Sequence, residues 1–316
     1  MKVKRILDAT ASDFEKMDRA ALLESVRLAE GRTVCAEVVA VSVPLVGGVT
    51  NAEMAAACGA DLISLNGYDV LHPMVMGAPG GAGLALADLP IPIPADFPLG
   101  LGASTSDVKR LVGRPVGTKL DCVPPERREE FGGRAATADN ARRAVELGAD
   151  FLWLAGNPGT GASTHLITQG VAEVAEAVGD QVIVIAGKMH GAGLGRADVV
   201  SEEAIRRYAE AGADIIVVPA PGTVPGATLE YTKDLVEAIH AAGPLAMTGM
   251  GTSQEGADVE TVRQIAMISK MTGADILHIG DAGFSGMALP ENITAFSIAI
   301  RGQRHTYRRM ALSLRR

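Results

Sequence analysis

Ionisable and amide side chains that could carry out chemistry stand inside, or just after, short apolar runs of this sequence. Charged groups are rare in such surroundings, because burying a charge is costly unless it is paired. Lysine, histidine and carboxylate groups are also the side chains that move protons or polarise a carbonyl group. The candidates are Glu37, Asn66, Lys119, Asp121, Lys188, His190 and His278.

The two lysines point to carbonyl chemistry. Lys119 and Lys188 can act as proton donors, enolate stabilisers or Schiff-base nucleophiles, with Glu37 or His190 moving the proton. The structural alternative is an ion pair, for example of Lys119 with Glu37 or Asp121. Catalytic roles are therefore expected for Glu37, Lys119, Asp121, Lys188 and His190, and substrate contacts for Asn66 and His278.

A repeat organises the elements that must position these residues. The tripeptide Gly-Ala-Asp occurs at 59–61, 148–150, 212–214 and 273–275, each time after an Ala-rich helical segment and before an apolar run. A further strand and helix separate consecutive copies, so strand and helix alternate eight times, which predicts a (β/α)8 TIM barrel. The expected strands are 34–41, 62–66, 116–121, 151–155, 182–186, 215–219, 245–248 and a last one after Asp275.

Alignment of the four copies predicts which strand face lines the barrel. Ser64, Trp153, Val217 and His278 take equivalent positions, and polar residues of the second and eighth strands fall on this face. We therefore expect it to be the interior, which makes His278 either a core histidine or a substrate contact. The same reasoning turns Glu37, Asn66, Lys119 and His278 inward.

Glycine-rich turns follow the fourth, fifth, seventh and eighth strands. Glycine lets backbone N–H groups approach an anion, and the loops after strands seven and eight are the usual phosphate site of such barrels. Plain turn chemistry is the alternative, and the carboxylate of Asp281 counts against a bound phosphate. The turn 156–163 has the spacing of a P-loop but Ala162 where lysine is required, which argues against nucleotide hydrolysis. Expected substrate contacts are Asn157, Gly249, Gly251, Thr252, Ser253, Gly280, Asp281, Ala282 and Gly283.

The remaining segments complete one domain over residues 1–316. Residues 1–33 form a helical cap in which Ser12 and Asp18 are the expected N-caps. Residues 67–103 are crowded with proline and glycine, and we expect a lid or a subunit contact there. A last helix from Pro290 to about Ile300 leads into a basic tail to residue 316, interpreted as a solvated or subunit-contacting face rather than an anion site.

Composition narrows the partners. The chain has 316 residues, 47% of them hydrophobic, so a sizeable core can be buried. A net charge of −8 argues against nucleic acid or an anionic membrane as main partner. The three cysteines lack the spacing of metal ligands, and we interpret them as reduced thiols. Neither a signal peptide nor a transmembrane run is visible. We expect a cytoplasmic homo-oligomer.

Two stretches resemble a known group of proteins. The opening Asp8-Ala9-Thr10-Ala11-Ser12-Asp13-Phe14 and the helix Asn51-Ala52-Glu53-Met54 running into Gly59 resemble an uncharacterised bacterial family within the phosphate-binding TIM-barrel superfamily. Its members are sometimes labelled phosphoenolpyruvate-mutase-like or haloacid-dehalogenase-like. The second label requires Asp-x-Asp at the end of a Rossmann strand, which this sequence lacks, and the metal carboxylates of the mutases find no match. The resemblance implies the fold and a phosphate, but no reaction.

Three functions compete. The first is a lyase, aldolase or isomerase acting on a small phosphorylated carbonyl compound or sugar phosphate. The second is an FMN-dependent oxidoreductase with the flavin phosphate in the same two loops and Lys188 near the flavin ring. The third is a non-catalytic phosphosugar-binding protein, disfavoured by the number of buried ionisable residues. No cofactor is required by the first function, and Mg²⁺ or FMN remains open.

Overall fold

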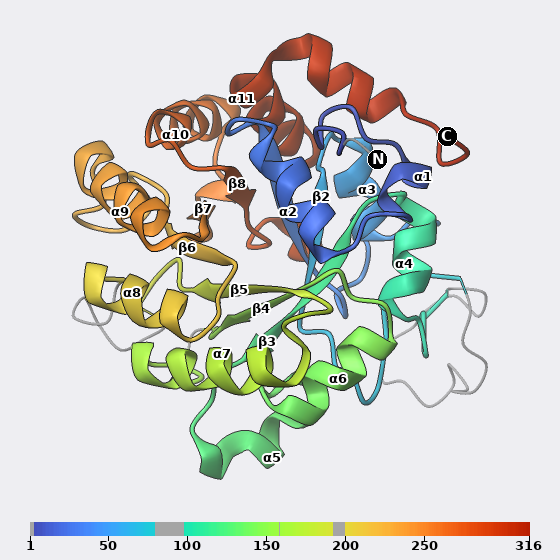
Figure 1. Ribbon diagram of the computed structural model, residues 1–316. Helices are drawn as coiled ribbons and strands as arrows, with labels where there is room; N and C mark the ends of the chain where they lie inside the picture. The colour runs from blue at the N-terminus through green and yellow to red at the C-terminus, as the bar shows by residue number, and fades with distance from the viewer. Residues whose placement is uncertain (1–2, 80–97, 158, 192–199) are drawn as a thin grey trace.

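Short runs of branched apolar residues form the strands, as a closed parallel barrel buried on both faces requires. The computed structural model describes residues 3–79, 98–157, 159–191 and 200–316. Within them eight parallel strands close a barrel in chain order, with helices around it (Figure 1). The strands are β1 Thr33–Val39, β2 Leu62–Asn66, β3 Val116–Asp121, β4 Phe151–Ala155, β5 Ile183–Gly187, β6 Ile215–Pro219, β7 Leu245–Met250 and β8 Ile276–Ile279.

Most of the described helices begin after a residue whose side chain accepts a backbone N–H of the first turn, which satisfies one of the free donors there. These caps are Asp18, Thr50, Ser104, Thr137, Ser163, Ser201, Thr228 and Asp258. The helices are α1 Ala11–Phe14, α2 Arg19–Arg27, α3 Asn51–Ala57, α4 Thr105–Val112, α5 Arg128–Phe131, α6 Ala138–Glu146, α7 Thr164–Val178, α8 Glu202–Glu210, α9 Leu229–Ala242, α10 Val259–Met271 and α11 Pro290–Ala311.

Each Gly-Ala-Asp tripeptide joins two neighbouring strands through hydrogen bonds of its aspartate, and we call this arrangement a clasp. In each copy the aspartate side chain accepts a backbone N–H of the preceding strand, at 2.8–2.9 Å, and its own N–H donates to the carbonyl of the same residue. The glycine of each copy has a positive φ and ends the preceding helical segment. The clasped pairs are Asp61 with Val34, Asp150 with Val116, Asp214 with Val184 and Asp275 with Ala246. The repeat therefore fixes the barrel where its strands begin.

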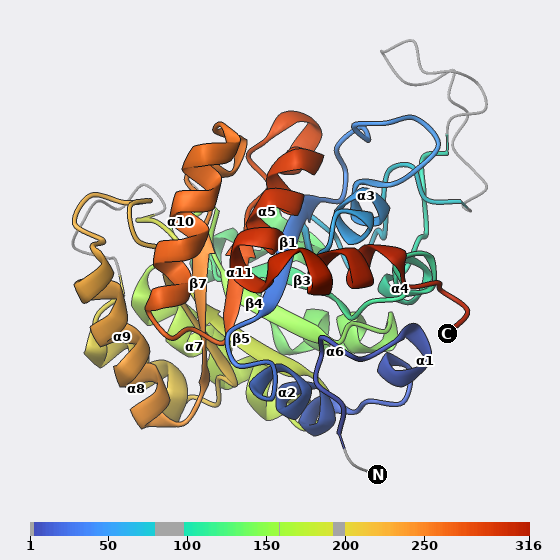
Figure 2. The same cartoon turned by 90° about the horizontal axis from the view of Figure 1, so that it is seen from above.

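The interior face is the predicted one. One apolar cluster fills the barrel, and a second lies between the strands and the helices. Residues of α2 and of the chain before it join the interior cluster, so α2 closes the end at which the strands begin (Figure 2). The strand face that carries the interior cluster also carries Glu37, Asn66, Lys119 and His278, in agreement with the prediction.

The structure differs from the expectations at both ends of the chain. Thr10, and not Ser12, is the N-cap residue of α1. The last helix does not end near Ile300 but runs on to Ala311, with a break at Gly302 where φ is +75°. Its basic face is also not solvated throughout, because Arg301 and Arg309 are buried and both pair with Asp61. These arginines lock the helix onto the first Gly-Ala-Asp clasp.

The segment 67–103 is described only at its two ends, and residues 80–97 lie outside the described residues. The two ends pair with each other, through a bridge between Met74 and Leu101 and a hydrogen bond from the Val75 N–H to the Gly100 carbonyl. The expected lid or subunit contact remains a prediction. Among the described helices, none is both long and apolar enough to cross a membrane.

Candidate functional site

A pocket of about 440 Å³ lies where the strands end, which is the catalytic face of such barrels. Its lining comes from β1, β2 and β3 and from the loops after β4, β5, β7 and β8. The lining residues are Glu37, Asn66, Lys119, Asn157, Met189, His190, Gly191, Gly251, Thr252, Ser253, Gly280, Asp281 and Ala282.

Glu37 is the centre of a buried charge network. Its Oε1 accepts a hydrogen bond from Lys119 Nζ at 3.0 Å, and its Oε2 lies 3.0 Å from His278 Nε2. Burial alone would raise the pKa of Glu37, but the Lys119 charge and the His278 hydrogen bond lower it to about 2. Burial would likewise lower the pKa of Lys119, and the charges of Glu37 and Asp281 raise it above its ordinary value. Carboxylate and ammonium therefore hold each other in the charged state.

The pKa of Asp281 is shifted in the opposite direction to that of Glu37. Burial raises the pKa of Asp281 to about 7, and the neighbouring Glu37 charge adds to the rise, against Lys119 and a hydrogen bond from Asn66. Asn66 Nδ2 donates to Asp281 Oδ2 at 2.7 Å. The Glu37 carboxylate thus favours the protonated form of Asp281. A carboxyl group is thus poised to bind and release a proton near neutral pH.

Two amides connect this pair to the third acidic residue. Asn157 Nδ2 donates to Asn66 Oδ1 and to Asp121 Oδ1, each at 3.2 Å. Asp121 is buried, which raises its pKa, and it lies behind Asn157 rather than in the pocket lining. Asp121 therefore holds Asn157 in place and does not itself line the pocket. The catalytic role expected for Asp121 stays a prediction.

Of the two candidate residues that follow β5, Lys188 and His190, only His190 lines the pocket. His190 lines the pocket, and burial together with the Lys119 charge lowers its pKa, so its imidazole is neutral near pH 7. Lys188 is buried outside the lining, and its Nζ donates to the Ala162 carbonyl at 3.2 Å. His278 is fully buried below the pocket, where it holds Glu37. His278 does not line the pocket, and the substrate contact expected for it stays a prediction.

The ring of Trp153 packs against the charge network of Glu37, Lys119 and His278. Lys119 Nζ stands 4.8 Å from the centroid of its ring, and the ring of His278 meets it edge-on at 4.9 Å. The position was predicted to face inward, but no role was expected for it. Because the chain has one tryptophan, its fluorescence reports on this site.

Packing accounts for several glycines of the expected phosphate loops. A Cβ on Gly249 would come within 2.3 Å of Met189 Cγ, and a Cβ on Gly283 within 2.0 Å of the Met287 carbonyl oxygen. Neither of these two glycines lines the pocket, whereas Gly251, Thr252, Ser253, Gly280, Asp281 and Ala282 do. The glycine pattern thus has a structural reason that is independent of any anion.

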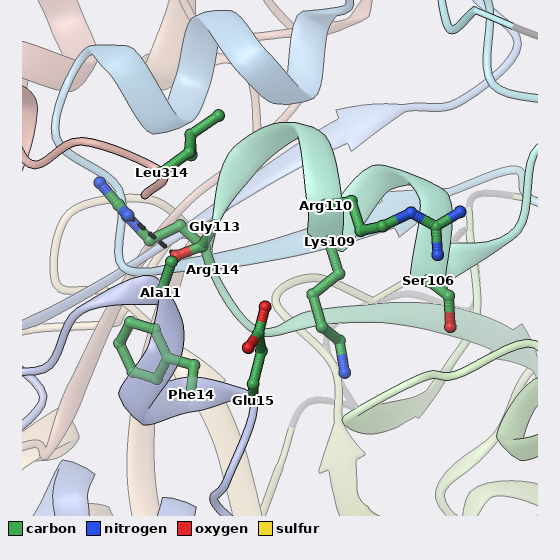
Figure 3. Close-up of a pocket in the computed structure, with 9 residues that line it drawn as sticks. All are labelled: Ala11, Phe14, Glu15, Ser106, Lys109, Arg110, Gly113, Arg114 and Leu314. Atoms are coloured by element: carbon green, nitrogen blue, oxygen red, sulfur yellow. Dashed lines mark hydrogen bonds between the residues drawn. The ribbon is translucent and has the colours of Figure 1, made fainter. Parts of the chain in front are cut away.

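A second pocket, of about 410 Å³, lies among α1, α4 and the C-terminal segment (Figure 3). Its charged groups are largely committed to neighbours: Lys109 pairs with Asp150, and Arg110 pairs with Asp107. Figure 3 shows the guanidinium of Arg114 turned away from Glu15 and Lys109. Among the described residues no group of three or more His, Cys, Asp or Glu side chains is arranged to hold a metal ion.

The chain belongs to a family described as a domain of unknown function, DUF7916, whose model matches residues 7–316. A curated relative, geranylgeranylglyceryl phosphate synthase from Methanothrix thermoacetophila, is 33% identical over 94 residues, which are 30% of this chain. The matched part is 32% of that enzyme, so the chain spans about a third of its length.

Two solved structures match this chain at low similarity. Tryptophan synthase from M. tuberculosis matches with a TM-score of 0.47 and 15% identity, over 90% of this chain and 100% of the other. A 2,3-dimethylmalate lyase of the PEP mutase/isocitrate lyase superfamily matches with a TM-score of 0.47 and 15% identity, over 83% and 81%. No reaction is inferred from either. The closed barrel also leaves the haloacid-dehalogenase-like label without support, since that chemistry needs a Rossmann strand end.

Proposed function

We propose that this protein is an enzyme that moves a proton on a small carbonyl compound, as a lyase or an isomerase does. The observation that carries the proposal is a pocket lined by Lys119, Asp281 and His190, in which Lys119 is held by the buried carboxylate of Glu37. The two neighbouring carboxyl groups also have opposite pKa shifts. The pKa of Glu37 is lowered to about 2 and that of Asp281 is raised to about 7. Environments that push two titratable groups apart in this way are typical of acid–base catalysis.

Asp281 is the proton carrier in this proposal. Near neutral pH it is present in both protonation states, so it can take a proton from carbon next to a carbonyl group and return it. Asn66 orients the carboxyl group through its 2.7 Å hydrogen bond. His190, which is neutral and also lines the pocket, is the second candidate for the proton transfer.

Lys119 stabilises the charge that develops on the carbonyl oxygen. Its ammonium group lines the pocket, and its raised pKa keeps it protonated, which suits a hydrogen-bond donor to an enolate. The same shift disfavours a Schiff base, because that nucleophile must be a neutral amine. Glu37 is a positioning residue that holds Lys119 and remains ionised throughout.

The size of the pocket suits a small substrate, since about 440 Å³ is near the lower end for ligand sites. The sequence favoured a phosphorylated compound, and this part of the expectation depends on the loops after β7 and β8. The flavin alternative is not proposed: it needs the same loops, and it needs Lys188 beside the ring, whereas Lys188 donates to the Ala162 carbonyl.

Deuterium exchange tests the proposal without knowledge of the full reaction. Small ketones, hydroxyketones and 2-oxo acids, with and without phosphate groups, are incubated with the protein in D₂O and followed by proton NMR. We expect exchange next to the carbonyl group of at least one compound. Asp281→Asn should slow that exchange by about 100-fold or more, because the variant cannot accept the proton.

Asp139→Asn is the matched control: it is the same chemical change at a residue of α6 that is 94% exposed and does not line the pocket. Its exchange rate should equal that of the wild-type protein. Equal rates in Asp281→Asn and the wild-type protein would contradict the role given to Asp281.

A further inference from the structure

The loop after β7 contains a concavity that is shaped for an anion. Ser253 has a φ of +78°, which is uncommon for a residue other than glycine, and the 3₁₀ turn η5 Gln254–Gly256 follows it. A left-handed residue followed by right-handed backbone turns successive N–H groups toward one point, which makes an anion-binding nest. The nest lies at the corner of β7 and β8, where barrels of this kind usually hold phosphate.

The side chain of Glu255 already fills this nest. Glu255 is fully buried, and its Oε1 accepts the N–H of Ala282, in the loop after β8, at 3.2 Å. Burial raises the pKa of Glu255, whereas the N–H groups of Glu255 itself, Ala282 and Ser253 favour the ionised form. A Cβ on Gly280 would come within 2.6 Å of Oε1, so the carboxylate fits closely behind the pocket wall.

The position of Glu255 is fixed from outside as well. Asn292 on α11 donates through Nδ2 to the Glu255 carbonyl at 2.9 Å and to the Ala257 carbonyl at 2.8 Å. Thr252, which was expected to donate to an anion, donates its hydroxyl to the Thr223 carbonyl at 2.7 Å. The Thr252 hydroxyl and the Ala282 N–H are thus already engaged within the protein, and the Glu255 carboxyl group occupies the place that an anion would take.

We propose that the Glu255 carboxylate takes the place of a substrate phosphate in this corner and thereby restricts the pocket to compounds that bring no phosphate there. A second anion at the Ala282 N–H would lie within hydrogen-bond distance of a buried carboxylate and be repelled. The class of substrate that fits is a small, uncharged hydroxycarbonyl compound, whose hydroxyl groups can meet the exposed Ser253 and the backbone of Gly280. This inference rests on the proposed function only in taking the pocket as the substrate site.

Two variants at position 255 distinguish the effect of filling the nest from the effect of the carboxylate charge. Glu255→Ala empties the nest, and Glu255→Gln keeps it filled with a neutral group of the same size. Each is titrated with inorganic phosphate and with acetate by calorimetry and thermal shift, against sodium chloride at equal ionic strength. Phosphate stabilises many proteins by exclusion from their surface, so the shift of the wild-type protein is the baseline.

We expect Glu255→Ala to bind inorganic phosphate at least tenfold more tightly than the wild-type protein or Glu255→Gln does, and acetate to stabilise it by replacing the missing carboxylate. An equal gain in Glu255→Gln would contradict the proposal, as would a Glu255→Ala protein that gains from neither anion.

The wild-type protein decides the matter if Glu255→Ala does not fold. Inorganic phosphate should then leave the amide NMR resonances of Ser253 and Ala282 unchanged in the wild-type protein, and shifts that saturate with phosphate would contradict the proposal. Because no turnover is measured, these results do not depend on whether the pocket catalyses proton transfer.

Discussion

At the scale of residues, the site is defined by how differently two carboxyl groups are treated. Glu37 has Lys119 and His278 within hydrogen-bond distance and stays ionised, whereas Asp281 has an amide partner and the charge of Glu37 beside it. Burial favours the neutral form of Asp281, and a proton also relieves the repulsion from Glu37, so the pKa of Asp281 rises to about 7.

This shift predicts how stability depends on pH. Between about pH 4 and pH 7 the folded protein holds a proton on Asp281 that the unfolded chain has lost, so this group makes the folded state less stable as pH rises. Asp281→Asn removes the effect. The variant should have the larger free energy of unfolding at pH 8, by about 1–3 kcal/mol, and a difference that shrinks toward pH 4.

Urea unfolding of both proteins from pH 4 to pH 8 provides the measurement, with Asp139→Asn as the exposed control. A variant that is less stable than the wild-type protein at pH 8, or a difference that does not change with pH, would refute the assignment.

At the scale of elements, the Gly-Ala-Asp clasp determines where each pair of strands is joined. Asp150 accepts the Val116 N–H at 2.8 Å and pairs with Lys109 at 2.7 Å, at the end of the barrel away from the pocket. The repeat therefore belongs to stability and not to catalysis, in keeping with the usual division between the two faces of such barrels.

Asp150→Ala leaves the Val116 N–H without its partner and should lower the free energy of unfolding by about 1–3 kcal/mol. Asp139→Ala, on the neighbouring helix and exposed, should change it by less than about 0.5 kcal/mol. Deuterium exchange of any substrate found should be equal in both variants at a temperature where both are folded. An Asp150→Ala protein as stable as the control would show that the clasp contributes little.

At the scale of the whole molecule, more of the fold than of the site could be predicted from the sequence. The eight strands and the inward face of Glu37, Lys119 and His278 were predictable, because four copies of one tripeptide mark alternate strands and period-two alternation assigns the faces. The phosphate expectation came from glycine content, which cannot tell an anion site from close packing. Only the fold shows that Glu255, remote from Asp281 in sequence, reaches the loop after β8.

The same limit explains the roles that were assigned differently. Lys188 and His190 are two residues apart, and sequence alone could not tell that one lines the pocket and the other donates to Ala162. Asp281 was expected to contact substrate, and the role of proton carrier that we propose for it depends on its burial beside Glu37, which is a property of the folded barrel.

The titration of Asp281 itself tests the central claim most directly. Carbon-13 NMR of protein labelled at aspartate side-chain carboxyl carbons, with the Asp281 signal assigned by its absence in Asp281→Asn, follows protonation of this one group from pH 3 to pH 9. We predict a midpoint near pH 7, about three units above that of an ordinary aspartate. A midpoint near pH 4 would contradict the account, because Asp281 would then be fully ionised at neutral pH and unable to donate a proton.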